Sequence, residues 1–268
     1  GGTLTNSCTD EMWQGIFVEG HSNLHQTSAN QGTVVLRNGA VIENALCGIR
    51  TGAPGYTSNT STGGIVHASD ATFRNCAKSV AFFPYADTVS GTTIRNNFSG
   101  FSNCTFTVDD NNLFAANDTS FDTHVSLWDV RGVSFEGCTF NNATTAMTYD
   151  RGYAIKAEDA GFSISTLCDT VYTEPTTDCQ CPAGKATYSS FSGFLTAVSA
   201  ATTGNTYYVS VDEARFSNNG TGVSFSGNGH VAVTRNDFNM NSLPGTLMEG
   251  AGLSLNGCTG YLVEENNF

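Results

Sequence analysis

The sequence FRNCAKSV at residues 73–80 is one of five copies of a short frame, and this frame decides the fold. The other copies are IENALCGI (42–49), FNNATTAM (140–147), FSGFLTAV (191–198) and FSNNGTGV (216–223). In each copy Ile or Phe stands first, Asn or Gly is third, a small residue or Ser is seventh, and Ile, Val or Met is eighth. Internal repeats of this kind are typical of architectures in which each repeat packs on the next.

A second frame overlaps the first at its Phe residue. It has an apolar residue first, Cys or Asn three positions later and Phe five positions later, as in FSNCTF (101–106), FEGCTF (135–140), VTRNDF (233–238) and VEENNF (263–268). The shared position recurs at spacings of 31, 33 and 34 residues from Ile42 to Phe140, and of 22 and 30 residues from Phe216 to Phe268. Such variable periods are typical of a solenoid whose coils carry loops of different length.

Short alternating segments such as VVLRNGAVI (34–42) and YYVSV (207–211) predict strands with one buried face, and no segment has a sustained helical period. We therefore predict an all-β fold with almost no helix, a right-handed parallel β-helix solenoid of about nine or ten coils. A β-sandwich or β-propeller is the alternative, but propeller blades repeat at about 40 residues or more. Residues 1–268 are expected to form a single domain, and because the chain stops in mid-repeat at Phe268 we expect it to be part of a longer chain or an assembly.

The repeat position of each residue predicts two rows that run through the stack. The interior row is expected to contain Ile42, Phe73, Phe106, Phe140, Phe216 and Phe238. The second row, at a turn, is expected to contain Asn44, Asn75, Asn142 and Asn218, with side-chain amides that bond along the stack.

The composition limits the classes of partner. Only 13% of residues are charged, and 24 acidic residues against 11 basic residues give a net charge of −13. No basic stripe is available to displace counterions from phosphates or to attract an anionic membrane surface, so we expect no nucleic-acid partner. No apolar stretch approaches the roughly 20 residues that span a bilayer, so we expect no membrane insertion. With 39% hydrophobic residues, 18 of them Phe, the chain has ample material for a core.

Nine cysteines predict an oxidising compartment and hence an extracellular location, because thiols stay reduced in the cytosol. Three of them lie in TLCDTVYTEPTTDCQCPAGK (166–185), which reads as a Cys-rich loop insertion. A disulfide from Cys168 to Cys179 or to Cys181 would staple that loop. The spacing of these three residues does not match a zinc site, so we expect no metal and no cofactor.

Cys104 and Cys138 occupy the same repeat position on neighbouring coils. Their α-carbons are expected about 4.8 Å apart, which is inside the range that a disulfide allows. Two stacked buried thiols that fill the core are the alternative. The repeat position leaves both possibilities open.

The sequence shows no set of residues that would converge on one catalytic site, so we expect no catalytic residue. Glycoside hydrolysis needs two carboxylates about 5 to 10 Å apart, and adjacent acidic residues on a strand point to opposite faces. The densest charged segment is DRGYAIKAEDAG (150–161). Its candidates for ligand binding are Arg151, Lys156, Glu158 and Asp159, and exposed surface ion pairs are the alternative for these residues.

Five stretches cover much of the chain: MWQGIFVEG (12–20), VVLRNGAVIENALCGI (34–49), GGIVHASDATFRNC (63–76), HVSLWDVRGVSFEGCTF (124–140) and YLVEENNF (261–268). Together they resemble secreted right-handed β-helix repeat proteins of Bacteroidota. Such proteins usually carry an export signal and often a C-terminal sorting domain, so the resemblance implies a processed or partial chain. It also implies O-glycosylation at Asp-Thr-Val motifs, which makes Thr88 and Thr170 the candidate acceptors.

Two functions follow from this sequence. The first is an extracellular structural or surface protein that self-associates end to end, as a glycosylated filament subunit, because head-to-tail contacts do not close. The alternative is a β-helix that binds or degrades a polysaccharide, for which Tyr85, Tyr149, Tyr153 and Tyr172 could supply a stacking platform. An open groove would favour a carbohydrate partner, and buried end-to-end contacts would favour assembly.

Overall fold

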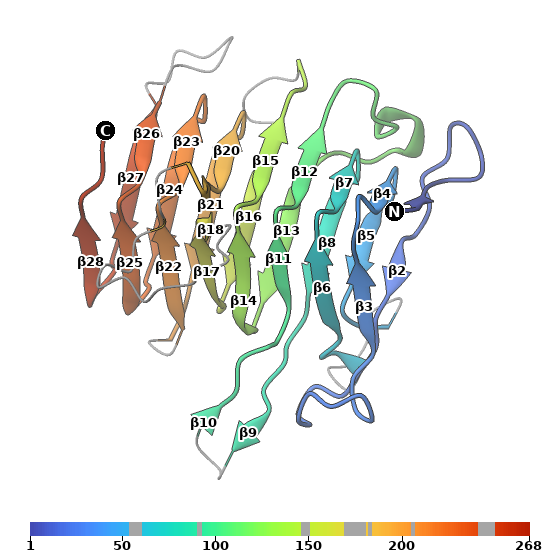
Figure 1. The fold of residues 1–268 in the computed structure, drawn as a ribbon, viewed down its shortest axis with the longest axis horizontal. Coiled ribbons are helices and arrows are strands. Elements are labelled where there is room, and N and C mark those ends of the chain that lie inside the picture. The colour runs from blue at the N-terminus through green and yellow to red at the C-terminus, as the bar shows by residue number, and fades with distance from the viewer. Residues whose placement is uncertain are drawn as a thin grey trace.

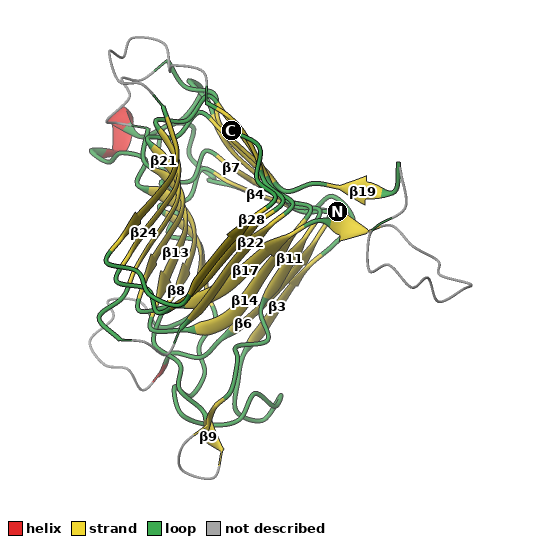
Figure 2. Cartoon of the chain, turned by 90° about the vertical axis from the view of Figure 1, so that its left-hand side faces the viewer, coloured by secondary structure: helices red, strands yellow, loops and turns green. Residues whose placement is uncertain are grey.

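The computed structural model describes residues 1–53, 61–89, 93–145, 151–168, 181, 184–204, 207–240 and 250–268. The chain winds through three sheets in turn, so each strand pairs in parallel with the corresponding strand of the previous coil. Among the described strands, two short antiparallel hairpins are the exceptions to this order. This is the predicted parallel β-helix. Figure 1 shows the coils following one another along the long axis, and Figure 2 shows the three sheets as the sides of a prism.

Each sheet contains eight strands in the described part of the chain. Sheet I comprises β2 (Ile16–Phe17), β5 (Cys47–Arg50), β8 (Lys78–Phe82), β13 (Thr123–Trp128), β16 (Tyr153–Glu158), β21 (Thr196–Ala201), β24 (Thr221–Ser226) and β27 (Ala251–Asn256). Sheet II comprises β3 (Thr33–Leu36), β6 (Ile65–Ser69), β11 (Gly100–Ser102), β14 (Arg131–Glu136), β17 (Gly161–Ser165), β22 (Tyr208–Asp212), β25 (His230–Thr234) and β28 (Tyr261–Glu264). Sheet III comprises β1 (Thr3–Leu4), β4 (Val41–Glu43), β7 (Thr72–Arg74), β12 (Thr105–Val108), β15 (Thr139–Asn142), β20 (Ser190–Ser192), β23 (Arg215–Ser217) and β26 (Asp237–Asn239).

The stack has about eight coils rather than nine or ten, because several stretches leave it. Strands β9 (Thr88–Val89) and β10 (Thr93–Ile94) form an antiparallel hairpin that projects from the solenoid (Figure 1). Strands β18 (Leu167–Cys168) and β19 (Ala186–Thr187) pair in the same way at the base of the Cys-rich insertion. The described residues also include a 3₁₀ turn, Ala115–Asn117.

The predicted interior row is confirmed. The rings of Phe73, Phe106, Phe140, Phe191, Phe216, Phe238 and Phe268 stack in one column with neighbouring centroids 4.5 to 5.0 Å apart. Ile42 and then Leu4 continue this column toward the first coil, because Ile42 pairs in register with Phe73 and Leu4 with Ile42. The ring spacing equals the spacing of hydrogen-bonded strands, so each coil places its ring directly on the ring of the coil before.

Left-handed residues turn the chain from sheet III to sheet I. Asn44, Asn75 and Asn218 have φ of 51° to 55°, and each stands two positions after a residue of the column. Asn tolerates this region because its short polar side chain bonds locally. Asn142 instead ends β15 in the extended conformation, and its amide donates to the carbonyl of Arg151. The expected amide bonds among the four Asn residues are not formed in the described structure.

Candidate ligand-binding groove

A groove of about 400 Å³ lies on the outer face of sheet II, across β3, β6, β11 and β14. Its floor follows the strand register: Val35 lies opposite His67, His67 opposite Gly100, and Gly100 opposite Ser134. A Cβ atom on Gly100 would stand 2.8 Å from the Oγ atom of Ser134. The floor therefore has no side chain at Gly100, between the side chains of His67 and Ser134.

Polar side chains line the groove and are available to a ligand. Arg37 and His67 lie on its β3 and β6 side, and Ser102, Ser134 and Glu136 lie on its β11 and β14 side. None of these five side chains has a hydrogen bond or an ion pair to another residue of the described structure. Hydrogen-bond donors and acceptors are thus both present in the groove without a partner among the described residues.

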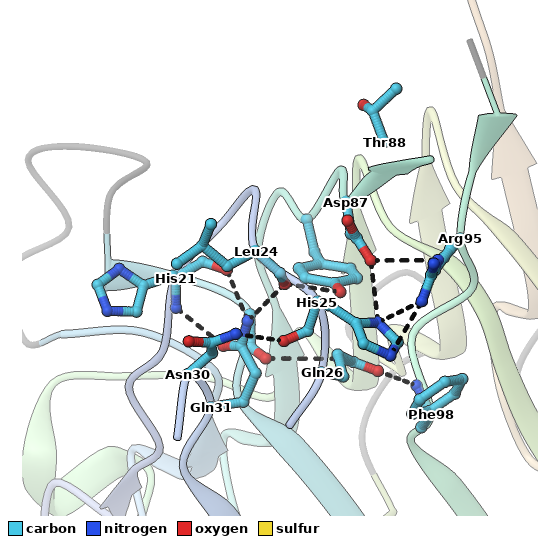
Figure 3. Close-up of polar contacts among 12 residues, drawn as sticks. His21, Leu24, His25, Gln26, Asn30, Gln31, Asp87, Thr88, Arg95 and Phe98 are labelled. Atoms are coloured by element: carbon cyan, nitrogen blue, oxygen red, sulfur yellow. Dashed lines mark hydrogen bonds and ion pairs between the residues drawn. The ribbon is translucent and has the colours of Figure 1, made fainter. Parts of the chain in front are cut away.

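Phe98 forms an aromatic end of the groove, and the residue is 51% exposed. Its backbone N–H donates to Oε1 of Gln26 at 2.6 Å, and the ring of His25 packs edge-on at a centroid distance of 6.2 Å. His25 Nδ1 lies 3.1 Å from Oδ2 of Asp87, and Nε of Arg95 lies 3.5 Å from the same oxygen (Figure 3). Loop residues therefore hold the exposed ring in place.

The loop before β3 is held by its own polar contacts (Figure 3). Gln31 accepts from the backbone N–H of His21 at 2.8 Å and donates to the carbonyls of His21 and Leu24 at 2.7 and 3.0 Å. The hydroxyl of Tyr85 donates to the carbonyl of Leu24 at 3.0 Å, and burial raises the pKa of Tyr85 to about 12. This network holds the loop from which His25 and Gln26 contact Phe98.

Arg151, a predicted ligand residue, is buried at the turn from sheet III to sheet I. Its guanidinium donates to the carbonyls of Asn142 and Gly193 at 3.2 Å each and to the carbonyl of Thr144 at 2.6 Å. A buried guanidinium that donates to three carbonyls satisfies backbone acceptors that would otherwise be unpaired. These contacts hold the turn and leave Arg151 inside the protein.

The other three predicted ligand residues lie away from this turn. Lys156 stands over the ring of Tyr153, with Nζ 5.3 Å from the centroid, and Glu158 is exposed at the end of β16. Asp159 follows β16 and accepts from the backbone N–H of Thr203 at 2.8 Å, a bond that lowers its pKa. Arg151 and Asp159 thus flank opposite ends of β16, and the structure does not bring the four predicted residues into one cluster.

The structure decides between the alternatives that the sequence left open for the cysteines. Cys168 is bonded to Cys181 with their Cα atoms 5.6 Å apart, whereas Cys179 lies outside the described residues. Cys104 and Cys138 form no disulfide and are buried free thiols. Burial raises the pKa of the Cys138 thiol well above its ordinary value, which disfavours the thiolate that disulfide exchange requires.

The predicted glycosylation acceptors and the predicted tyrosine platform lie partly at the surface, partly in the interior and partly outside the described residues. Thr88 is exposed at the start of β9 and stands apart from the polar contacts of Figure 3, whereas Thr170 lies outside the described residues. Tyr85 is buried, so it offers no stacking platform, and Tyr149 and Tyr172 also lie outside the description. Within the described ranges, no group of three His, Cys, Asp or Glu residues could hold a metal ion.

The residues of the groove escape sequence analysis because they come from four coils. Phe98 stands in a loop between repeats, and His67 is a lone histidine in its repeat. The available signal is Gly100, which falls at the outward position that Ser134, Ser163 and Ser210 occupy on later coils. Recognising this signal requires the strand register, and an error of two residues in a predicted register would place another residue opposite Ser134.

None of the helices in the described chain is long and apolar enough to cross a membrane. Comparisons with models of protein families, with curated proteins and with solved structures found no match to this chain.

Proposed function

We propose that this chain is an extracellular surface β-helix protein that binds a polysaccharide in the groove on sheet II. The observation that carries the proposal is the exposed ring of Phe98 beside polar side chains that make no hydrogen bond or ion pair to another described residue. A sugar ring presents an apolar face to an aromatic side chain and a rim of hydroxyls to donors and acceptors. Arg37, His67 and Glu136 supply those polar contacts around the floor at Gly100.

The lining favours binding over cleavage. Hydrolysis of a glycosidic bond uses two carboxyl groups about 5 to 10 Å apart on either side of that bond. Among the described residues that line the groove, Glu136 is the only carboxylate. A polysaccharide would therefore be held here rather than hydrolysed.

The test is binding to a panel of polysaccharides by affinity electrophoresis, followed by titration calorimetry with the best ligand. We expect Phe98→Ala to weaken binding at least tenfold, which corresponds to about 1.4 kcal/mol. The matched control is Trp128→Ala, which removes an exposed aromatic ring from sheet I and should leave binding unchanged. Binding that is equal in both variants, or absent from the wild-type protein across the panel, would refute the proposal.

End-to-end association is a second candidate, and the ends of the aromatic column favour it. Phe268 is 70% exposed at one end of the column, and Leu4 is 47% exposed at the other. Contact of these ends between copies would continue the column and pair the open edges of all three sheets. Sedimentation at rising concentration with electron microscopy should then show filaments that Phe268→Asp abolishes, whereas compact monomers throughout would exclude this candidate.

Secretion and glycosylation remain part of the proposal. The Cys168–Cys181 disulfide supports an oxidising compartment, and Thr88 is exposed in an Asp-Thr-Val motif that resembles Bacteroidota acceptor sites. Intact mass of the secreted protein should exceed the sequence mass, and Thr88→Ala should remove one glycan. A secreted protein of unmodified mass would exclude glycosylation.

A further inference from the structure

The groove opens at one side onto a row of small residues that continues along sheet II. In strand register, Gly100 on β11 is followed by Ser134 on β14, Ser163 on β17, Ser210 on β22 and Ala232 on β25. Their neighbours in each strand are buried, so this row faces outward. The row forms a floor without large side chains that extends well beyond the 400 Å³ groove.

Aromatic side chains stand along one margin of this floor. Phe98 precedes Gly100 by two residues, Tyr208 precedes Ser210 by two, and His230 precedes Ala232 by two. Side chains two residues apart on a strand share a face, so Tyr208 and His230 point outward like Ser210 and Ala232. Phe98 stands in the loop before β11, and its place at this margin follows from its position in the lining of the groove. Tyr208 is 59% exposed, and His230 on the next strand is exposed as well. Phe98 stands before β11 and Tyr208 begins β22, and these two strands are three strand steps apart, or about 14 Å.

Hydroxyl and acidic side chains stand along the other margin. Two residues after the floor position come Ser102, Glu136, Ser165, Asp212 and Thr234. Asp212 accepts from the Thr234 hydroxyl at 2.7 Å and pairs with Arg235, whereas Glu136 has no partner in the described structure. This margin offers hydrogen-bond acceptors and repels anions, as does the net charge of −13.

We propose that the ligand of this face is an extended, uncharged polysaccharide that lies along the β-helix axis, across the strands from β6 to β25. This inference rests on the proposed carbohydrate binding and adds the direction, length and charge of the ligand. Five strand steps from β6 to β25 span about 24 Å. One sugar unit of an extended chain is about as long as one strand step, so about five units are in contact, with Phe98 and Tyr208 under units near the two ends.

The experiment is calorimetric titration of the full chain with uncharged oligosaccharides of two to six units, drawn from cello-, manno-, xylo- and N-acetylated chito-oligosaccharides. Affinity should rise with each added unit up to about five and then level off. Oligogalacturonate of equal length should bind at least tenfold more weakly at low salt. Equal affinity for the two-unit and six-unit ligands, or tighter binding of oligogalacturonate, would overturn the inference.

Two variants test where the polysaccharide lies on sheet II. Ser163→Tyr fills the floor beyond the groove and should weaken the six-unit ligand at least tenfold while it leaves the two-unit ligand unchanged. The matched control is Ser199→Tyr, at an outward position of sheet I, and thermal unfolding checks that both variants fold. If Phe98→Ala loses binding while Ser163→Tyr has no effect, the proposed carbohydrate binding would stand, but the extended path across the strands would be refuted. No binding of any oligosaccharide to the wild-type protein would refute carbohydrate binding itself.

Discussion

His124 is a histidine fully enclosed in the aromatic interior of the β-helix. Its ring centroid lies 4.8 Å from that of Phe121, 5.7 Å from Phe194 and 6.0 Å from Phe106, and its Nδ1 lies 2.9 Å from Oγ of Ser79. Burial lowers the pKa of His124 from 6.5 to about 3, because the interior disfavours the charged imidazolium. His124 is therefore a neutral core residue at physiological pH.

Acid should destabilise the protein through this residue. As pH falls below 6.5, His124 becomes protonated in the unfolded chain, whereas in the folded chain it stays neutral down to about pH 3. The free energy of unfolding therefore decreases through that interval. Between pH 7 and pH 4 the loss from His124 is about 3 kcal/mol. We expect His124→Leu to reduce the pH dependence of the unfolding free energy, measured with urea, by this amount.

Ser79→Ala is the control for this experiment. It removes the hydrogen-bond partner but keeps the buried imidazole, so the wild-type pH dependence should be retained. An unchanged pH dependence in His124→Leu would show that the imidazole is not buried in the native protein.

Cys104 and Cys138 make a second prediction at the residue scale. Both thiols are buried, so they should resist alkylation in the native protein and react once it is unfolded. Exposed Cys8 should react at once and serves as the internal control. A peptide map without reductant should show the Cys168–Cys181 linkage, and a Cys104–Cys138 linkage would contradict the structure.

At the scale of the elements, the aromatic column depends on small residues in sheet I. A Cβ atom on Gly222 of β24 would lie 2.6 Å from the carbonyl oxygen of Gly252 and 2.9 Å from ring carbons of Phe238. On β27, a Cβ atom on Gly252 would lie 2.8 Å from the ring of Phe268. Sheet I therefore approaches the column closely because glycine stands at these positions.

Gly222→Ala should destabilise the protein by about 1 to 3 kcal/mol, because the extra methyl group must displace a packed ring or the adjacent strand. The midpoint of urea unfolding measures this loss. Ser224→Ala changes an outward residue of the same strand and should shift stability by less than about 0.5 kcal/mol. A Gly222→Ala protein as stable as the wild type would show that the interior is looser than described.

The sequence predicts the strands and the column because both depend on local patterns. Phe106 and Phe140 bury one face of a strand and recur at one repeat position, so their stacking follows from the frame alone. The path of residues between repeats does not follow from it. Asn142 extends β15 where Asn44 turns the chain, and the β9–β10 hairpin leaves the stack, so the number of coils is overestimated.

The candidate site is harder to predict for the same reason. The groove depends on the register of β6, β11 and β14 and on a loop network that places Phe98 beside them. Arg151 shows the converse error, because a charged residue in a polar segment reads as exposed. In the structure it is buried and donates to three backbone carbonyls.

At the scale of the whole molecule, the β-helix turns a repeated outward position into a continuous track. Gly100 and Ser210 are more than a hundred residues apart in the chain yet share one row, because each coil repeats the register of the last. A solenoid of this kind presents an extended surface without needing a deep cavity. The aromatic and hydroxyl margins of the row give that surface the chemistry of a carbohydrate-binding face.

A crystal structure with an uncharged six-unit oligosaccharide, in a lattice that leaves sheet II free, tests carbohydrate binding most directly. We expect sugar density along the row from Gly100 to Ala232, with one unit on Phe98 and another on Tyr208. Density on a different face, or an empty sheet II at saturating ligand, would contradict the proposed function.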